Sequence, residues 1–217
     1  GLKRFWPIFR NFIPKAFDEM CQQGRITYNF HLCNVKLIPK KSSPTKIGNW
    51  RPICLLSVFY KVVSSAIANR LKTVIDKICS ISQKGYSPTK VIHESLINVL
   101  NIIHKAKTLN SNLAIVLVDF KKAFDSISHS FIEKVLKFFN FGPNFINTIK
   151  TMLTGKRGGI LIDGIATSIF DFLSGTGQGD PPSPLIFVIV IEVLSIKISN
   201  SSAIEKCVIG NEICPTD

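Results

Sequence analysis

Two long parts of this sequence contain no acidic residue. Residues 20–75 and 134–162 have neither Asp nor Glu. The first part carries nine basic side chains: Arg25, Lys36, Lys40, Lys41, Lys46, Arg51, Lys61, Arg70 and Lys72. The second carries Lys134, Lys137, Lys150, Lys156 and Arg157. The net charge of the 217 residues is +13. A solvated face explains a short basic run, but this much uncompensated charge is typical of a protein that binds a polyanion such as nucleic acid.

Metal-binding cysteine pairs and long apolar runs are also missing. No two of the six cysteines have the CxxC spacing, which argues against a zinc site or a thioredoxin-type motif. Residues 1–10 lack the apolar segment of a secretory signal. The longest apolar run, Leu185–Ile191, is far shorter than the roughly 20 residues that span a bilayer. We therefore expect an intracellular protein with reduced, mostly buried thiols and no membrane contact.

Hydrophobic residues make up 46% of the chain, enough for a sizeable core, and their spacing predicts mixed secondary structure. Helical spacing predicts helices over residues 9–20, 58–75, 91–107, 128–140 and 144–153, and an apolar helix with Ser183 as its N-cap. Strands are predicted over residues 30–38, 50–55, 159–162 and 167–172, the first two as a hairpin with a basic tip. The continuous apolar run of residues 113–118 predicts a strand buried on both faces.

Asp119 follows that predicted strand directly. A carboxylate at the end of a buried strand adds little stability, but it can hold a cation at the rim of a sheet. A turn or a helix cap is the simpler alternative for such an Asp. Asp125 fits that simpler role better, because it precedes the helix predicted after Ser128.

Two other segments carry side chains suited to a nucleotide. Arg51 offers a rigid fork of donors that matches phosphate oxygens, and Lys40 and Lys46 near the same hairpin add point charges. In residues 177–184, glycines flank Gln178, so that a ligand or another backbone can approach its amide. Each segment alone is equally compatible with an ordinary loop.

Taken in order, these motifs resemble reverse transcriptases of non-LTR (LINE-type) retrotransposons over nearly the whole chain. Ile38-Pro39-Lys40-Lys41, Asn49-Trp50-Arg51-Pro52-Ile53 and Gln83-Lys84-Gly85-Tyr86 resemble the motifs of the fingers. Residues 118–126 (VDFKKAFDS) resemble the first palm motif, and residues 177–187 (GQGDPPSPLIF) resemble the second. Thr176-Gly177 and Pro182 depart from the usual second motif.

The resemblance implies an α+β fold, the fingers and an incomplete palm of a right-hand polymerase. It places an N-terminal helical extension at residues 1–30, fingers at 31–110 and palm at 111–217, together one reverse transcriptase domain. The implied function is RNA-directed DNA synthesis, with an RNA template, a DNA primer and dNTPs as partners. No stable protein partner is expected, and the location implied for the parent element is nuclear and cytoplasmic.

The resemblance also assigns roles to single residues. Asp119 is the implied catalytic residue and holds Mg²⁺ together with the backbone carbonyl of Phe120, in a site for two Mg²⁺ ions, with Mn²⁺ as the alternative ion. The implied nucleotide-binding residues are Arg51, Lys40, Lys46, Phe124, Gln178 and Gly179. In the resembling enzymes, the aromatic residue at the position of Phe124 excludes a 2′-hydroxyl. Phe124 therefore favours DNA synthesis over the RNA synthesis of a viral RNA polymerase.

The third palm motif of the family, an aromatic-Ala-Asp-Asp hairpin, has no counterpart. The only Asp after Asp180 is Asp217, and residues 206–210 look like the strand that leads toward the hairpin. We therefore expect a fragment of a mobile-element polymerase that binds nucleic acid without extending a primer by itself. The alternative is a catalytically dead nucleic-acid-binding remnant of such an element.

Overall fold

A computed structural model describes residues 2–80, 82–86, 90–203, 208–209 and 212–213. Its helices are α1 (Leu2–Phe9), α2 (Phe12–Gln22), α3 (Tyr28–His31), α4 (Val58–Ile78), α5 (Ile92–Thr108), α6 (Ala123–Ser126), α7 (His129–Phe138), α8 (Pro143–Leu153), α9 (Ser183–Ser199) and the 3₁₀ turn η1 (Ile47–Asn49). Its strands are β1 (Leu32–Pro39), β2 (Trp50–Leu55), β3 (Arg157–Ile162), β4 (Ile165–Ala166), β5 (Phe170–Asp171), β6 (Val208–Ile209) and β7 (Glu212–Ile213). The predicted α+β class is confirmed.

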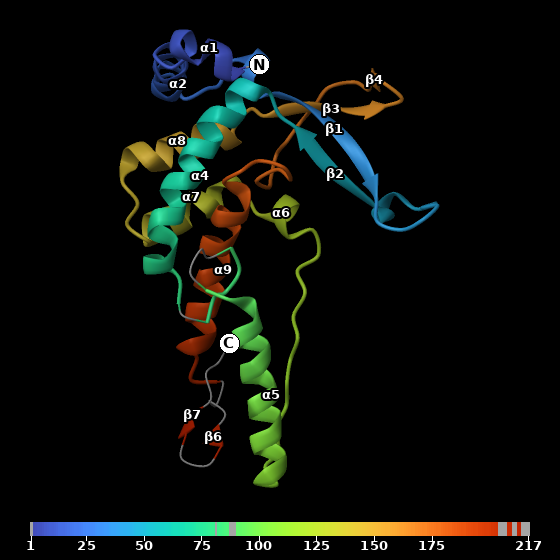
Figure 1. The fold of residues 1–217 in the computed structure, drawn as a ribbon, viewed down its shortest axis with the longest axis vertical. Coiled ribbons are helices and arrows are strands. Elements are labelled where there is room, and N and C mark those ends of the chain that lie inside the picture. Colours follow the sequence, from blue (N-terminus) through green and yellow to red (C-terminus); the bar gives the residue numbers. More distant parts are fainter. Residues whose placement is uncertain (1, 81, 87–89, 204–207, 210–211, 214–217) are drawn as a thin grey trace.

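The main sheet joins the two halves of the sequence. Strands β1 and β2 form the predicted antiparallel hairpin, with Ile38 opposite Arg51. Strand β1 also pairs in parallel with β3, which carries β4 and β5 on its other side. The hairpin and the β3–β4 arm project together from the helices (Figure 1). The sheet thus takes strands from both the predicted fingers range and the predicted palm range.

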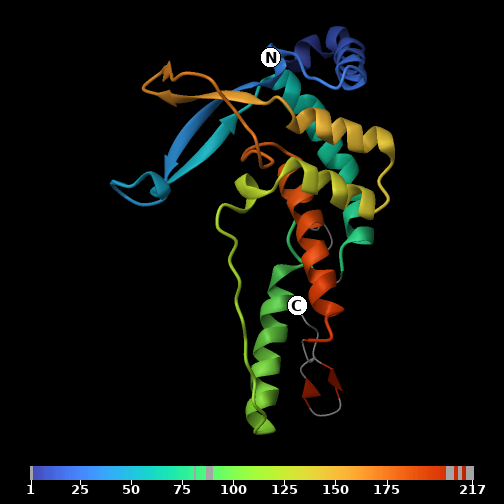
Figure 2. The same ribbon diagram turned by 180° about the vertical axis from the view of Figure 1, so that it is seen from behind.

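A bundle of four helices forms the body beside this sheet. Helices α4, α7, α8 and α9 pack together, with α2 against α4 and α8 (Figures 1 and 2). Their fully buried side chains make one continuous core: Tyr60, Leu71, Ile75, Ile132, Leu136, Ile149 and Ile189. Burying apolar area of this kind is the main stabilising contribution to a fold of this size.

Of the two caps predicted from the sequence, Ser128 is confirmed and Ser183 is not, while the described cysteines are free thiols as expected. The side chains of Ser57 and Ser128 accept hydrogen bonds from the first turns of α4 and α7. The N-cap prediction for Ser183 is wrong: Pro182 occupies the N-cap position of α9 without a capping hydrogen bond, and Ser183 Oγ donates to Thr176 O at 2.6 Å. Four cysteines are free thiols, three of them buried. Cys207 and Cys214 lie outside the described residues.

The strand predicted at residues 113–118 is not formed. The segment is extended but pairs with no described strand, and Leu117 is 92% exposed. It runs as a long trace beside α5 (Figure 1). An apolar, β-branched run becomes a strand only where a neighbouring strand can satisfy its backbone groups, and none of the described strands lies along it.

The C-terminal segment is described only in part. Residues 208–209 and 212–213 form the short pair β6–β7, and the rest of the strand predicted at residues 206–210 lies outside the described residues. Within the described ranges, no helix combines the length and the apolar content needed to cross a membrane.

Candidate functional site

A cleft of about 690 Å³ lies between the β1–β2 hairpin and the segment that leads into α6. Six of the predicted site residues line it: Lys40, Arg51, Asp119, Phe120, Phe124 and Gln178. Its other lining residues are Leu37, Ile47, Gly48, Trp50, Pro52, Lys122, Ala123 and Asp125. Residues more than 100 positions apart in the sequence therefore share one concave surface.

The hairpin supplies the basic wall of the cleft. Arg51 lies on β2 and is exposed. Lys40 follows β1 directly, and its Nζ donates to Gly48 O at 3.1 Å, which holds the ammonium over the hairpin tip. Lys46, at the N-cap of η1, is exposed and is not among the lining residues, so the structure does not place it in the cleft.

The glycine-rich loop, residues 174–179, brings Gln178 to the cleft. Its backbone carbonyl accepts from Cys54 N at 2.9 Å, which ties the loop to β2. Its side-chain Nε2 donates to Asp125 Oδ2 at 3.1 Å. Gly179 has a φ of +101°, and a Cβ there would lie 2.9 Å from Cys54 O. Gly179 therefore allows the close approach to β2 rather than lining the cleft.

The same loop is fastened to the Asp119–Asp125 side by backbone hydrogen bonds. Thr176 N donates to Phe124 O at 2.8 Å, and Gly175 N donates to Ile127 O at 2.8 Å. Ser174 Oγ donates to Asp125 O at 2.9 Å. These bonds make the two segments that carry Gln178 and Asp125 one unit.

Asp119 is exposed, and its carboxylate has no hydrogen bond or ion pair among the described residues. Asp125 is the other carboxylate in the cleft. No group of three metal-ligating side chains occurs within the described part of the chain. Mg²⁺, however, usually binds one or two carboxylates together with substrate phosphates and water. The residues present therefore fit an ion that arrives with a nucleotide.

The two aromatic residues predicted here are placed differently. Phe124 is half-buried and its ring lies against that of Phe187, with 5.1 Å between the ring centres. That contact limits where the Phe124 ring can move within the cleft. Phe120 is exposed and lines both this cleft and an apolar groove of about 530 Å³ beside α9.

Sequence reasoning assigned no nucleotide-binding role to three charged or aromatic residues of the cleft, Trp50, Lys122 and Asp125. Asp125 was interpreted as a turn or cap residue, although it also orients the Gln178 amide. Trp50 and Lys122 received no role and line the cleft. The available signal for all three was their position inside the motifs that resemble the family.

The second acid-free stretch does not present the free basic face that its composition indicated. Lys137 and Lys150 lie 2.7 Å and 3.4 Å from Glu133, and Arg157 Nε donates to Asp171 at 2.7 Å. The two lysines lower the pKa of Glu133 through hydrogen bonds. Lys156 is buried beside Asp180. Three acidic residues outside the stretch thus pair with four of its cations in the folded chain, Glu133 being shared by two lysines.

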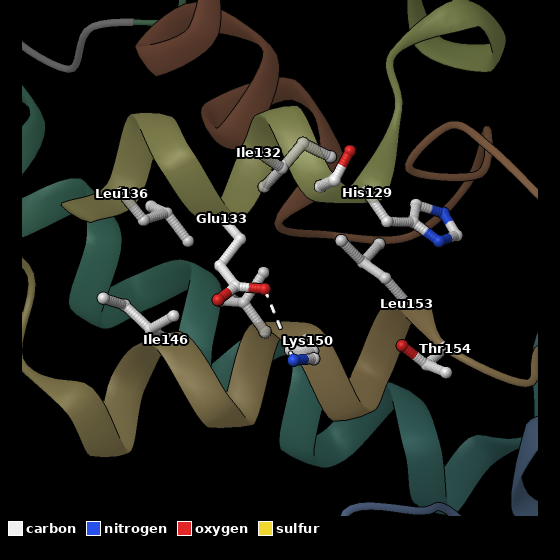
Figure 3. A pocket seen from close by; sticks show the side chains of 10 residues that line it. His129, Ile132, Glu133, Leu136, Ile146, Lys150, Leu153 and Thr154 are labelled. Atoms are coloured by element: carbon white, nitrogen blue, oxygen red, sulfur yellow. Dashed lines mark ion pairs between the residues drawn. The ribbon is translucent and has the colours of Figure 1, made fainter. Parts of the chain in front are cut away.

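A smaller cavity of about 260 Å³ is lined by residues of α7 and α8, which pack against each other (Figure 3). The Glu133–Lys150 ion pair crosses it, and Leu136, Ile146 and Leu153 supply its apolar wall. None of the predicted site residues lines it.

Comparison with known proteins identifies the family. The sequence profile described as "Reverse transcriptase (RNA-dependent DNA polymerase)" matches residues 38–210. The "Transposon TX1 uncharacterized 149 kDa protein" of Xenopus laevis is 30% identical over 87% of this chain and 14% of its own length. The "Retrovirus-related Pol polyprotein from type-1 retrotransposable element R2" of Popillia japonica is 28% identical over 96% of this chain and 29% of its own.

A third relative, the "RNA-directed DNA polymerase from mobile element jockey" of Drosophila melanogaster, is 24% identical over 81% of this chain and 19% of its own length. The chain therefore spans less than a third of the length of these relatives. The matched region contains the hairpin tip, strand β2, the segment with Asp119 and Asp125, and the glycine-rich loop, all of which contribute to the cleft. The chain belongs to the reverse transcriptase family, as a domain of the non-LTR retrotransposon type.

Proposed function

We propose that the cleft binds a Mg²⁺–dNTP complex, and that the protein containing this chain adds deoxynucleotides to a primer on an RNA template. The observation that carries the proposal is that basic and acidic side chains line two sides of one cleft. Arg51 and Lys40 line its hairpin wall, and the other wall carries Asp119 and Asp125 together with Lys122. The basic side chains suit the triphosphate, and the carboxylates suit the metal ions that accompany it.

In this proposal each side chain has a separate task. The Arg51 fork binds phosphate oxygens, while Asp119 holds the metal near them. Bound Mg²⁺ supplies Lewis-acid activation of the primer hydroxyl and stabilises the leaving pyrophosphate. The Gln178 amide, oriented by Asp125, contacts the sugar or base. The Phe124 ring, held against Phe187, excludes a 2′-hydroxyl.

Nucleotide binding is measurable because Trp50 lines the cleft and only one other Trp, Trp6, is present. In a Trp6→Phe background, Mg²⁺–dNTP is expected to change Trp50 fluorescence with saturation. Arg51→Ala should weaken that binding about tenfold or more, because a charge-assisted hydrogen bond to phosphate contributes about 1.5–3 kcal/mol.

Arg70→Ala is the matched control, since Arg70 is exposed on α4 and does not line the cleft. It should leave the dissociation constant unchanged. No saturable response in the Trp6→Phe protein, or equal affinity in the Arg51→Ala and Arg70→Ala variants, would contradict nucleotide binding in this cleft.

Binding to single-stranded nucleic acid should be strongly salt-dependent. If the basic surface neutralises about five phosphates, log K against log[salt] should fall with a slope of roughly −3.5. Filter binding or fluorescence anisotropy at several salt concentrations measures this slope. A slope near zero would show that the excess positive charge takes no part in binding.

A further inference from the structure

Three buried polar side chains meet behind the glycine-rich loop. Asp180 follows the loop, Tyr60 lies on α4, and Lys156 directly precedes β3. Their exposed fractions are 4%, 1% and 3%. Tyr60 Oη donates to Asp180 Oδ2 at 2.8 Å, and Lys156 Nζ lies 3.6 Å from the same oxygen. The ammonium is also 5.7 Å from the centre of the Tyr60 ring.

Stability alone is a poor explanation for this Tyr60–Asp180–Lys156 cluster. Removing two opposite charges from water offsets most of their mutual attraction, and apolar residues of similar volume often stabilise a core as well or better. Lys156 Nζ and Asp180 Oδ1 also have no hydrogen bond among the described residues. Burial, with a contribution from Asp180, raises the pKa of Tyr60 well above its usual value, so the hydroxyl remains a donor.

The cluster is joined to the cleft through a few atoms of the loop. Asp180 is two residues beyond Gln178, and a Cβ on Gly177 would lie 2.8 Å from Lys156 Nζ. Gln178 lies between Gly177 and Asp180 in the sequence, and its backbone carbonyl accepts a hydrogen bond from Cys54 N. The backbone around Gln178 is therefore held from behind, while Asp125 holds its side chain at the cleft.

We propose that Tyr60, Asp180 and Lys156 are positioning residues that fix the glycine-rich loop and thereby set the position of Gln178 for nucleotide binding. None of them lines the cleft, so they act through the loop and not by touching the nucleotide. The inference rests on the proposed nucleotide-binding function. It adds three residues, from three separate elements, on which affinity for the nucleotide depends.

Tyr60→Phe tests the proposal with the smallest possible change. It removes one hydroxyl and leaves the ring and the Lys156–Asp180 pair in place. In the Trp6→Phe background, we expect the dissociation constant for Mg²⁺–dNTP to rise about tenfold, the size expected for a hydrogen bond to a charged group. Binding to single-stranded DNA should be unchanged, because it depends on the basic surface.

Thr151→Val is the matched control. Thr151 is on α8 and buried, and its Oγ1 has no hydrogen-bond partner among the described residues. Losing this hydroxyl should leave both binding constants unchanged. A purely structural effect of the Tyr60 hydroxyl would instead weaken both kinds of binding together, in step with a lower melting temperature.

The double variant Lys156→Met/Asp180→Asn gives a second test if Tyr60→Phe folds poorly. It removes both charges at once, so no buried charge is left unpaired and the net charge of the chain stays the same. We expect a folded protein with nucleotide affinity at least about tenfold weaker and unchanged DNA binding.

The outcomes separate this inference from the function on which it rests. Saturable nucleotide binding in the reference protein, with selective loss in the variants, supports both. Absence of nucleotide binding in the reference protein contradicts the proposed function itself. Equal nucleotide affinity in reference and variants, parallel loss of both kinds of binding, or unfolding of both variants overturns the positioning role.

Discussion

Replacing Asp119 with Ala is expected to reduce nucleotide addition about a thousandfold or more. The free carboxylate of Asp119 lines the cleft opposite Arg51, where a triphosphate would bring its metal ion. Metal ions stabilise the charge of the transition state of phosphoryl transfer by several kcal/mol. Losing the protein ligand of the metal removes that stabilisation. Asp125 cannot replace it fully, because one of its oxygens accepts from Gln178.

The rate is measured as primer extension on an RNA template with Mg²⁺. Because the chain spans 29% of the Popillia japonica R2 polyprotein, we would place residues 1–217 in a chimera with the rest of that relative. Asp18→Ala on α2 is the control, since Asp18 is exposed and does not line the cleft. Retention of more than about a tenth of the extension rate by Asp119→Ala would exclude Asp119 as a metal ligand.

The second large effect concerns the backbone of the glycine-rich loop. Gly175 has a φ of +83°, and a Cβ there would lie 2.6 Å from Phe124 O and 2.7 Å from Asp125 Cα. Gly175→Ala therefore combines a left-handed conformation, costing about 1–2 kcal/mol, with a backbone overlap of about 1–3 kcal/mol. We expect the free energy of unfolding to fall by about 3 kcal/mol and the melting temperature by about 10 °C.

Gly155→Ala separates the cost of the left-handed conformation from the cost of the backbone overlap. Gly155 has a similar φ of +72°, but a Cβ there would have no atom within 4 Å. Its variant should lose only about 1 kcal/mol, measured by the same denaturant or thermal unfolding. Equal losses in the two variants would mean that Gly175 does not hold the loop tightly against Phe124 and Asp125.

Local patterns predicted most helices and the hairpin well. Helix α4 begins at Val58 as expected and runs to Ile78, three residues beyond the predicted end. Strand β2 covers the predicted Trp50–Leu55. These elements follow from side-chain periodicity, serine caps and turn residues, all of which act within a few residues of the chain.

The failures came where the outcome depends on distant partners. Residues 113–118 have the composition of a buried strand, but composition does not say which strand edge will be available to them. The composition around Lys156 indicates a basic surface, yet Lys156 is buried against Asp180, which lies 24 residues further along the chain. The Tyr60–Asp180 bond links residues 120 positions apart, and no local pattern indicates it.

The cleft itself was predictable only in part. Residue chemistry singled out Arg51, Asp119 and Gln178, the resemblance to reverse transcriptases implied their roles, and the structure brings these three to one surface. The hydrogen bond that orients Gln178 from Asp125 depends on how the loop folds back over α6, which the motif alone did not reveal.

The most direct test of the nucleotide site is a crystal structure of residues 1–217 with a dNTP and Mn²⁺, using the anomalous signal of manganese. The proposed function predicts a manganese peak at the Asp119 carboxylate, the triphosphate against Arg51, and the sugar or base beside Gln178. A nucleotide bound away from this cleft, or a manganese peak that Asp119 does not contact, would contradict it.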